Sequence, residues 1–175
     1  MDYFFFYQSS SPFSQWHHSP FTTAGEDDDE ELIKFHTAEH YMMYQKAKMF
    51  FDNTAMQAIL ATKSPAAAKA IGRKVRGFEK ERWEYVCLDV IYRGNRLKFE
   101  QNPKLMADLK LTAGKKMVEC SPSDKIYGCG FAMDDTRRWN EEKWTGTNWL
   151  GEVLTELRDD FQYDRAKQFS SLEFY

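Results

Sequence analysis

The chain has 175 residues, a hydrophobic fraction of 42%, and a formal net charge of -3 with an isoelectric point near 5.8. That length and apolar content suffice for one globular domain whose core needs no disulfide or metal to hold it together. The acidic balance excludes an overall basic field of the kind that a non-specific nucleic-acid coat uses, so any nucleic-acid contact would be local.

Cysteine usage and hydropathy bear on where the protein works. The three cysteines are an odd number and include no C-x-x-C pair, which argues against a disulfide framework and a cysteine-rich zinc site. No window approaches the roughly 20 apolar residues of a membrane span, and the first residues lack the pattern of a signal peptide. We therefore expect a soluble, unprocessed, cytoplasmic protein.

The N-terminal segment alternates aromatic and polar stretches. YFFFYQ, residues 3–8, predicts a short strand. The turn-rich segment after it carries Phe13, Trp16 and Phe21, too many aromatic residues for a solvated linker, so we expect it to pack onto the body. The run GEDDDEEL at 25–32 predicts a solvated acidic loop without a function of its own.

Three helices are predicted in the middle of the chain. The first runs from Thr37 to Phe51, and SPAAAKAIGRKV begins the second, with Ser64 as N-cap. The longest runs from about Glu79 to Glu100, with Lys and Arg on the face opposite to an apolar stripe. The stripe consists of Trp83, Val86, Cys87, Val90, Ile91, Gly94 and Leu97.

The C-terminal part begins with a helix in 102–114, capped by Asn102 and ended by Gly114. KKMVECS, residues 115–121, predicts a short strand, and 122–148 predicts a long ordered loop near a site. A last helix is predicted over 148–161. We expect one domain over 1–162 and a loosely held tail over 163–175.

The helix KFHTAEHYMMYQKAKMFF, residues 34–51, allows two readings of its polar residues. His36, Glu39 and His40 match the H-x-x-E-H pattern of one zinc-peptidase class. Alternatively, Glu39 and Lys46 stand seven residues apart, which is about 20° short of two turns and ~10.5 Å along the axis. Their side chains then share a face, and Lys46 leans back toward the space before Glu39.

Five motifs occur in series along the chain and together identify a family. They are PFSQWHHSPF, TAEHYMMYQKAKMF, RWEYVCLDVIYRGNRLKFEQNPKL, KKMVECSPSDKIYGCG and WTGTNWLGEVLTELR. From about Phe4 to Phe161 the chain resembles the NADAR family, also called YbiA-like. The resemblance implies a compact, mainly helical α+β single-domain fold with a few short strands, and N-glycosidase activity without a cofactor.

The resemblance also implies a substrate class and a set of site residues. The substrate is either a ribosylamino-pyrimidine phosphate of riboflavin biosynthesis or ADP-ribosylated guanine in nucleic acid. The family's catalytic residues fall on Glu39, Lys46 and Asp124, and its aromatic positions on Trp83 and Trp144. Candidates for substrate binding are Trp83, Trp144, Asn148, Trp16, His40 and Tyr127.

Cleavage of a ribose C1′–N bond explains why a carboxylate and an amine stand together. Positive charge builds on the ring, which Glu39 or Asp124 can stabilise while moving a proton. A neutral Lys46 can form a Schiff base that water then hydrolyses, but it must first lose its charge through burial or a neighbouring cation. For phosphate we consider Arg73, Lys74 and Arg76, and the backbone N–H groups of 128–130.

Two other functions are weighed against this hypothesis. The zinc-peptidase reading has no third ligand downstream, and Thr37 as N-cap would put His36 outside the helix. A module that binds ADP-ribose or a nucleotide without cleaving it needs no amine beside a carboxylate, and a turnover assay separates it from an enzyme. We expect the ribosylated substrate as partner, with neither a membrane nor an obligate protein.

Overall fold

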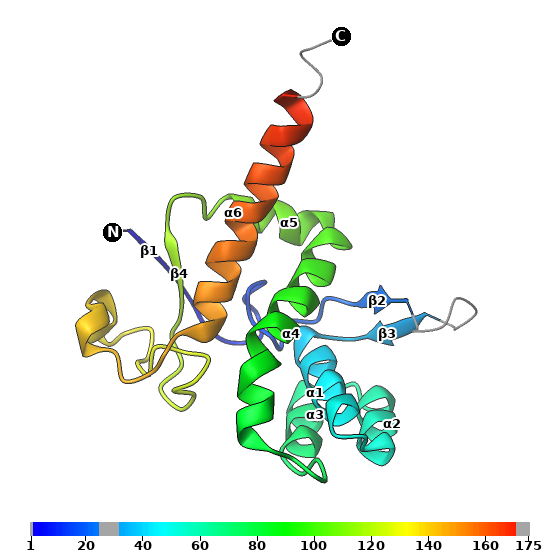
Figure 1. Cartoon of the computed structure of the whole chain (residues 1–175). Coiled ribbons are helices and arrows are strands. Elements are labelled where there is room, and N and C mark those ends of the chain that lie inside the picture. The colour runs from blue at the N-terminus through cyan, green and yellow to red at the C-terminus, as the bar shows by residue number, and fades with distance from the viewer. Residues whose placement is uncertain (1, 25–31, 171–175) are drawn as a thin grey trace. The chain divides into compact units, whose positions relative to one another are not determined.

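The computed structural model describes residues 2–24 and 32–170, including side chains as far as Tyr163. These residues form two compact units, one within residues 8–103 and one of residues 2–7 together with those from 104 onward (Figure 1). The described part is mainly helical with a few short strands, which confirms the predicted fold class. None of its helices is long and apolar enough to cross a lipid bilayer.

The unit of residues 8–103 contains one small sheet and four helices. β2 (Phe21–Thr23) pairs antiparallel with β3 (Ile33–Phe35), an element pair that the sequence pattern did not predict. α1 packs against three neighbouring helices, so its side chains are enclosed from several directions. The helices are α1 (Ala38–Met49), α2 (Asn53–Ala61), α3 (Pro65–Gly72) and α4 (Lys80–Glu100).

The predicted helix starts are confirmed where a local capping bond fixes them. Thr37 Oγ1 accepts the backbone N–H of His40 at 3.3 Å, and α1 begins at the next residue, Ala38. Ser64 Oγ accepts the N–H of Ala67 at 3.2 Å at the start of α3. α2, with Asp52 as its N-cap, was not predicted.

The apolar stripe of α4 is confirmed at its centre, where Trp83, Cys87 and Ile91 are buried. Gly94 in the same stripe is where α1 approaches most closely, because a Cβ there would lie 2.5 Å from Cδ1 of Tyr41. The prediction that the helix's Lys and Arg residues lie on the opposite, exposed face is wrong at Lys98, which is fully buried.

The other unit is built on a two-stranded parallel sheet. β1 (Tyr3–Phe6) pairs with β4 (Lys116–Glu119) in the register Tyr3↔Lys116, and α6 (Trp149–Ser170) packs against β4. Both strands were predicted. The long loop between β4 and α6 is ordered as expected and contains two 3-10 helices, η1 (Thr136–Trp139) and η2 (Glu141–Lys143).

Several predicted ends differ from the structure. α5 (Pro103–Lys110) stops before Gly114, which adopts a left-handed φ of 75° in the turn that follows. α6 continues to Ser170, past the predicted end at Phe161. The acidic run at 25–31 lies outside the described residues.

Candidate active site

Lys46 occupies the kind of surroundings that a nucleophilic amine requires. The residue is 9% exposed, and its Nζ lies 3.9 Å from the ring centroid of Phe78 and 5.9 Å from that of Trp83. Burial lowers the pKa of the Lys46 amine from its ordinary value, and the charge of Arg73 lowers it further. Both effects increase the fraction of neutral amine near pH 7.

Glu39 lies seven residues before Lys46 on α1, just under two helical turns, and is 2% exposed. Its negative charge acts on Lys46 in the direction that raises the pKa of the amine, opposing burial and Arg73. Its backbone N–H donates to the carbonyl of Gln15 at 3.0 Å, so the loop before β2 holds the first turn of α1. The carboxylate and the amine are therefore electrostatically coupled in one enclosed region.

His40 uses both ring nitrogens within the fold. Nε2 lies 3.1 Å from the carbonyl of Thr62, so it carries the proton and donates, and Nδ1 then accepts from the Thr37 hydroxyl at 2.8 Å. Burial, with a further contribution from His36, lowers the pKa of His40 and favours this neutral form. The predicted contact of His40 with substrate stays a prediction.

The zinc hypothesis finds no support in this geometry. His36 precedes the N-cap Thr37, and His40 has no free nitrogen for a metal without breaking a hydrogen bond. Within the ranges 2–24 and 32–163, no group of three or more His, Cys, Asp or Glu side chains is placed to hold a metal ion.

Trp83 lines an open cavity of about 660 Å³ on the unit of residues 8–103, and its ring centroid lies 5.9 Å from Lys46 Nζ. Neither Glu39 nor Lys46 lines this cavity. Trp83 belongs both to the cavity wall and to the surroundings of the Lys46 amine. Trp16, also predicted to bind substrate, is half-buried, and its backbone N–H donates to Ser14 Oγ at 3.1 Å. The cavity is lined by Gln45, Lys48, Met49, Phe51, Asn53, Met56, Trp83, Val86 and Val90.

The remaining predicted site residues belong to the other unit, in the loop between β4 and α6. Asp124 Oδ1 accepts the backbone N–H groups of Ile126 and Tyr127 at 3.1 and 3.0 Å, which organises the turn of the SPSD motif. Asp124 and Tyr127 are both half-buried, and the Tyr127 ring contacts that of Trp149 edge to face. The backbone geometry thus gives Asp124 a defined orientation.

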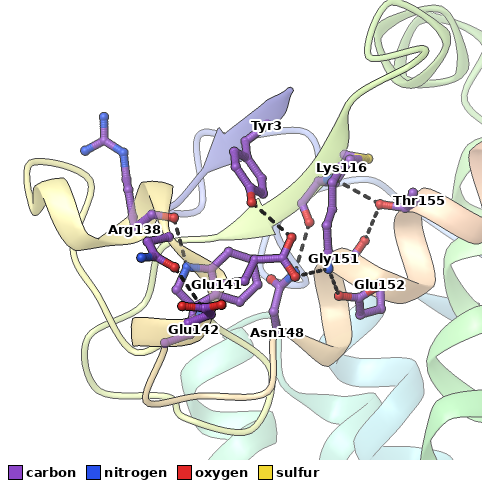
Figure 2. Close-up of polar contacts among 12 residues, drawn as sticks. Tyr3, Lys116, Arg138, Glu141, Glu142, Asn148, Gly151, Glu152 and Thr155 are labelled. Carbon is purple, nitrogen blue, oxygen red and sulfur yellow. Dashed lines mark hydrogen bonds and ion pairs between the residues drawn. The ribbon is translucent and has the colours of Figure 1, made fainter. Parts of the chain in front are cut away.

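Trp144 and Asn148 are tied into the same loop by hydrogen bonds (Figure 2). The Trp144 indole N–H donates to the carbonyl of Arg138 at 2.8 Å. The Asn148 amide donates to the carbonyl of Met117 at 3.0 Å and accepts the N–H of Glu119 at 2.9 Å, so it joins the start of α6 to β4. Asn148 is fully buried with a φ of 53°, a conformation that asparagine tolerates better than most residues.

The expected phosphate contacts are changed by the structure. Gly128 and Cys129 donate their N–H groups to the carbonyls of Asp124 and Glu119, so these two donors do not form an anion nest. Arg76 pairs with Asp52 at 2.9 Å. Arg73 is exposed and instead emerges as a charge that acts on Lys46.

Sequence reasoning missed Phe78, which covers the Lys46 amine while being 41% exposed itself. No local pattern marks it, because the segment between α3 and α4 has no period. Burial or a neighbouring cation was predicted to neutralise Lys46, but Arg73 was considered only as a phosphate contact.

Comparison with known proteins decides the family. Residues 3–162 match the family model of the NADAR domain. This chain belongs to the NADAR family. An N-glycosidase of Acanthamoeba polyphaga mimivirus is 40% identical over 150 residues, which are 86% of this chain and 87% of the relative.

Two further relatives extend this result. The Escherichia coli N-glycosidase YbiA is 33% identical over 74% of this NADAR chain and 72% of its own length. Its solution NMR structure matches 94% of this chain and 88% of YbiA, with a TM-score of 0.72 and 29% identity. The maize riboflavin biosynthesis protein PYRR is 36% identical over 71% of this chain but only 19% of its own length. The NADAR chain is thus an N-glycosidase, an enzyme that hydrolyses bonds between a sugar and nitrogen.

Proposed function

We propose that this NADAR protein cleaves the bond between ribose C1′ and an amine nitrogen through an imine formed on Lys46. The observation that carries the proposal is the burial of the Lys46 amine between aromatic rings, with its pKa lowered by burial and Arg73. A lowered pKa increases the fraction of neutral amine, and the neutral amine has the lone pair that attack on C1′ requires. A module that only bound a nucleotide would have no need of it.

The chemistry proceeds in two halves. A ribosylamine opens to an imine, the Lys46 amine adds to C1′, and the base leaves as a free amine, which transfers the imine to Lys46. Water then adds to C1′, releases the ribose as an aldehyde, and returns the Lys46 amine. The net reaction consumes one water and releases one amine and one ribose, without a change in oxidation state.

Glu39 is our candidate for the group that moves protons between Lys46, water and the leaving nitrogen. It is buried, it is coupled to Lys46, and its place on α1 is fixed by the first turn of the helix. Asp124 remains a candidate for a second carboxylate in the same reaction. Trp83, which lies beside Lys46, would cover the sugar or the base.

The substrate in this proposal carries a phosphate and an amine-linked ribose. A ribosylamino-pyrimidine phosphate and an ADP-ribosylated guanine both meet this description. The similarity to part of the maize riboflavin biosynthesis protein supports the first.

The proposal is tested by trapping the imine. The protein is mixed separately with ribosylaminopyrimidine phosphate and with an ADP-ribosylated guanine oligonucleotide, with EDTA present, and quenched with borohydride. We expect a reduced sugar adduct on the peptide that contains Lys46, with one of the two substrates. An adduct on Lys48 instead, or product release without any adduct, would contradict the role of Lys46. No product with either substrate would favour the binding module.

A further inference from the structure

Lys98 on α4 is a lysine that has no solvent contact and no carboxylate partner among the described residues. It is fully buried, and its Nζ donates to the carbonyl of Ser14 at 3.0 Å. Burial lowers the pKa of the amine to about 7. An amine in this position costs free energy of folding that an apolar side chain would not, so stability alone does not explain why it is there.

Asn95 makes a second buried contact from α4 to the same loop. Its side-chain N–H groups donate to Gln15 Oε1 and to the Ile91 carbonyl, both at 2.9 Å. Because both partners are acceptors, the orientation of the amide is fixed. Phe13 packs near Phe99 of α4, with ring centroids 6.5 Å apart. Residues 13–15 are thus held to α4 by three buried side chains.

The loop of residues 13–15 is in turn hydrogen-bonded to the backbone of Glu39. The carbonyl of Gln15, one of the three loop residues that contact α4, accepts the backbone N–H of Glu39 at 3.0 Å. Glu39 is in the first turn of α1, where N–H groups have no partner within the helix. A shift of the loop therefore moves the Glu39 backbone directly.

We propose that Lys98 and Asn95 are positioning residues for Glu39, acting through Ser14 and Gln15. Their hydrogen bonds go to Ser14, Gln15 and Ile91, and through this loop they set the place of the Glu39 carboxylate relative to the Lys46 amine. This inference rests on the proposed role of Glu39 in proton transfer. Displacement of a catalytic group by about 1 Å can cost on the order of 100-fold in rate.

A double-mutant cycle in kcat tests the proposal. Lys98→Met keeps the volume and removes the amine, Glu39→Gln removes the carboxylate, and the third variant combines both. Lys80→Met is the matched control, because Lys80 is on the same helix but its side chain is 74% exposed and forms a surface ion pair with Glu84. Each variant is assayed with both ribosyl substrates, and its melting temperature is measured.

We expect kcat of Lys98→Met to fall about 10- to 100-fold. Its KM should be unchanged, and its melting temperature should be unchanged or higher. Glu39→Gln should lose about 100-fold or more, and the double variant no more than Glu39→Gln alone. Multiplicative losses, or a Lys98→Met enzyme with normal kcat, would overturn the positioning role. A Glu39→Gln enzyme with normal kcat would instead remove Glu39 from the proposed function.

Asn95→Leu provides an independent arm if Lys98→Met does not fold. It removes the donor to Gln15 and replaces the amide with an apolar side chain of similar size. In the same cycle with Glu39→Gln, non-additive losses in kcat support the proposal and multiplicative losses contradict it.

Discussion

Helix α1 and the loop between β4 and α6 both carry residues predicted to act on substrate, but their polar atoms are used differently. In the loop, the amide of Asn148, the indole of Trp144 and one carboxylate oxygen of Asp124 are bonded to backbone groups. On α1, Lys46 is buried against aromatic rings, and its charged form is disfavoured.

This difference separates two kinds of buried polar group. A side chain that hydrogen-bonds to buried backbone groups stabilises the fold. If that side chain were removed, the backbone N–H or C=O groups would be buried without a partner, which costs their desolvation free energy. For Lys46, by contrast, burial favours the neutral amine, which is the form with a free lone pair.

Lys46→Ala should have the largest effect. The variant lacks the attacking amine, so we expect kcat to fall by roughly 1,000-fold or more, with the fold retained. Steady-state turnover of both ribosyl substrates, together with a circular dichroism melt, measures this. Turnover at the wild-type rate would show that the buried amine stores no reactivity.

Asp124→Asn tests whether the loop takes part in catalysis. An asparagine oxygen can still accept the N–H groups of Ile126 and Tyr127, so the turn should be kept while the charge is lost. If Asp124 moves a proton, kcat falls by about 100-fold at an unchanged melting temperature. A normal kcat would leave Asp124 only its role in the turn.

Asn148→Ala should act mainly on stability. It removes two buried hydrogen bonds to β4 and places alanine at a φ of 53°, so the free energy of unfolding should fall by roughly 2–4 kcal/mol. Urea denaturation measures this, and Asn148→Gly, which tolerates the φ, separates conformational strain from hydrogen bonding. If Asn148→Ala instead raised KM and left the stability unchanged, Asn148 would act by binding the ribose hydroxyls.

Arg73→Gln should have the smallest effect on activity, and the direction of its effect on the pH dependence can be predicted. Arg73 lowers the pKa of Lys46, so its removal raises that pKa and shifts the acidic limb of the kcat/KM profile to higher pH. Because Arg73 is exposed, we expect only a few-fold loss near neutral pH, and a smaller one at high salt. The neighbouring Lys74→Gln is the control, and an equal shift in it would point to a general surface effect.

The elements that sequence predicted best are those with local start signals. Thr37 and Ser64 cap their own helices through bonds to backbone three residues on, so nothing distant is needed to place them. β2, β3 and α2 were missed, since three-residue strands carry too short a period and α2 follows α1 after a short turn. Lys98 was placed on the wrong face because a long side chain is exposed by default.

The sequence by itself determined the family, the N-glycosidase class and the spacing of Glu39 and Lys46 on one helix, because motif order and helical geometry are properties of the chain. Only the tertiary structure decided that Lys46 is covered by Phe78 and influenced by Arg73, and that Lys98 grips the loop that holds Glu39. Burial and pKa depend on groups that arrive from distant segments, and no local pattern records which groups those will be.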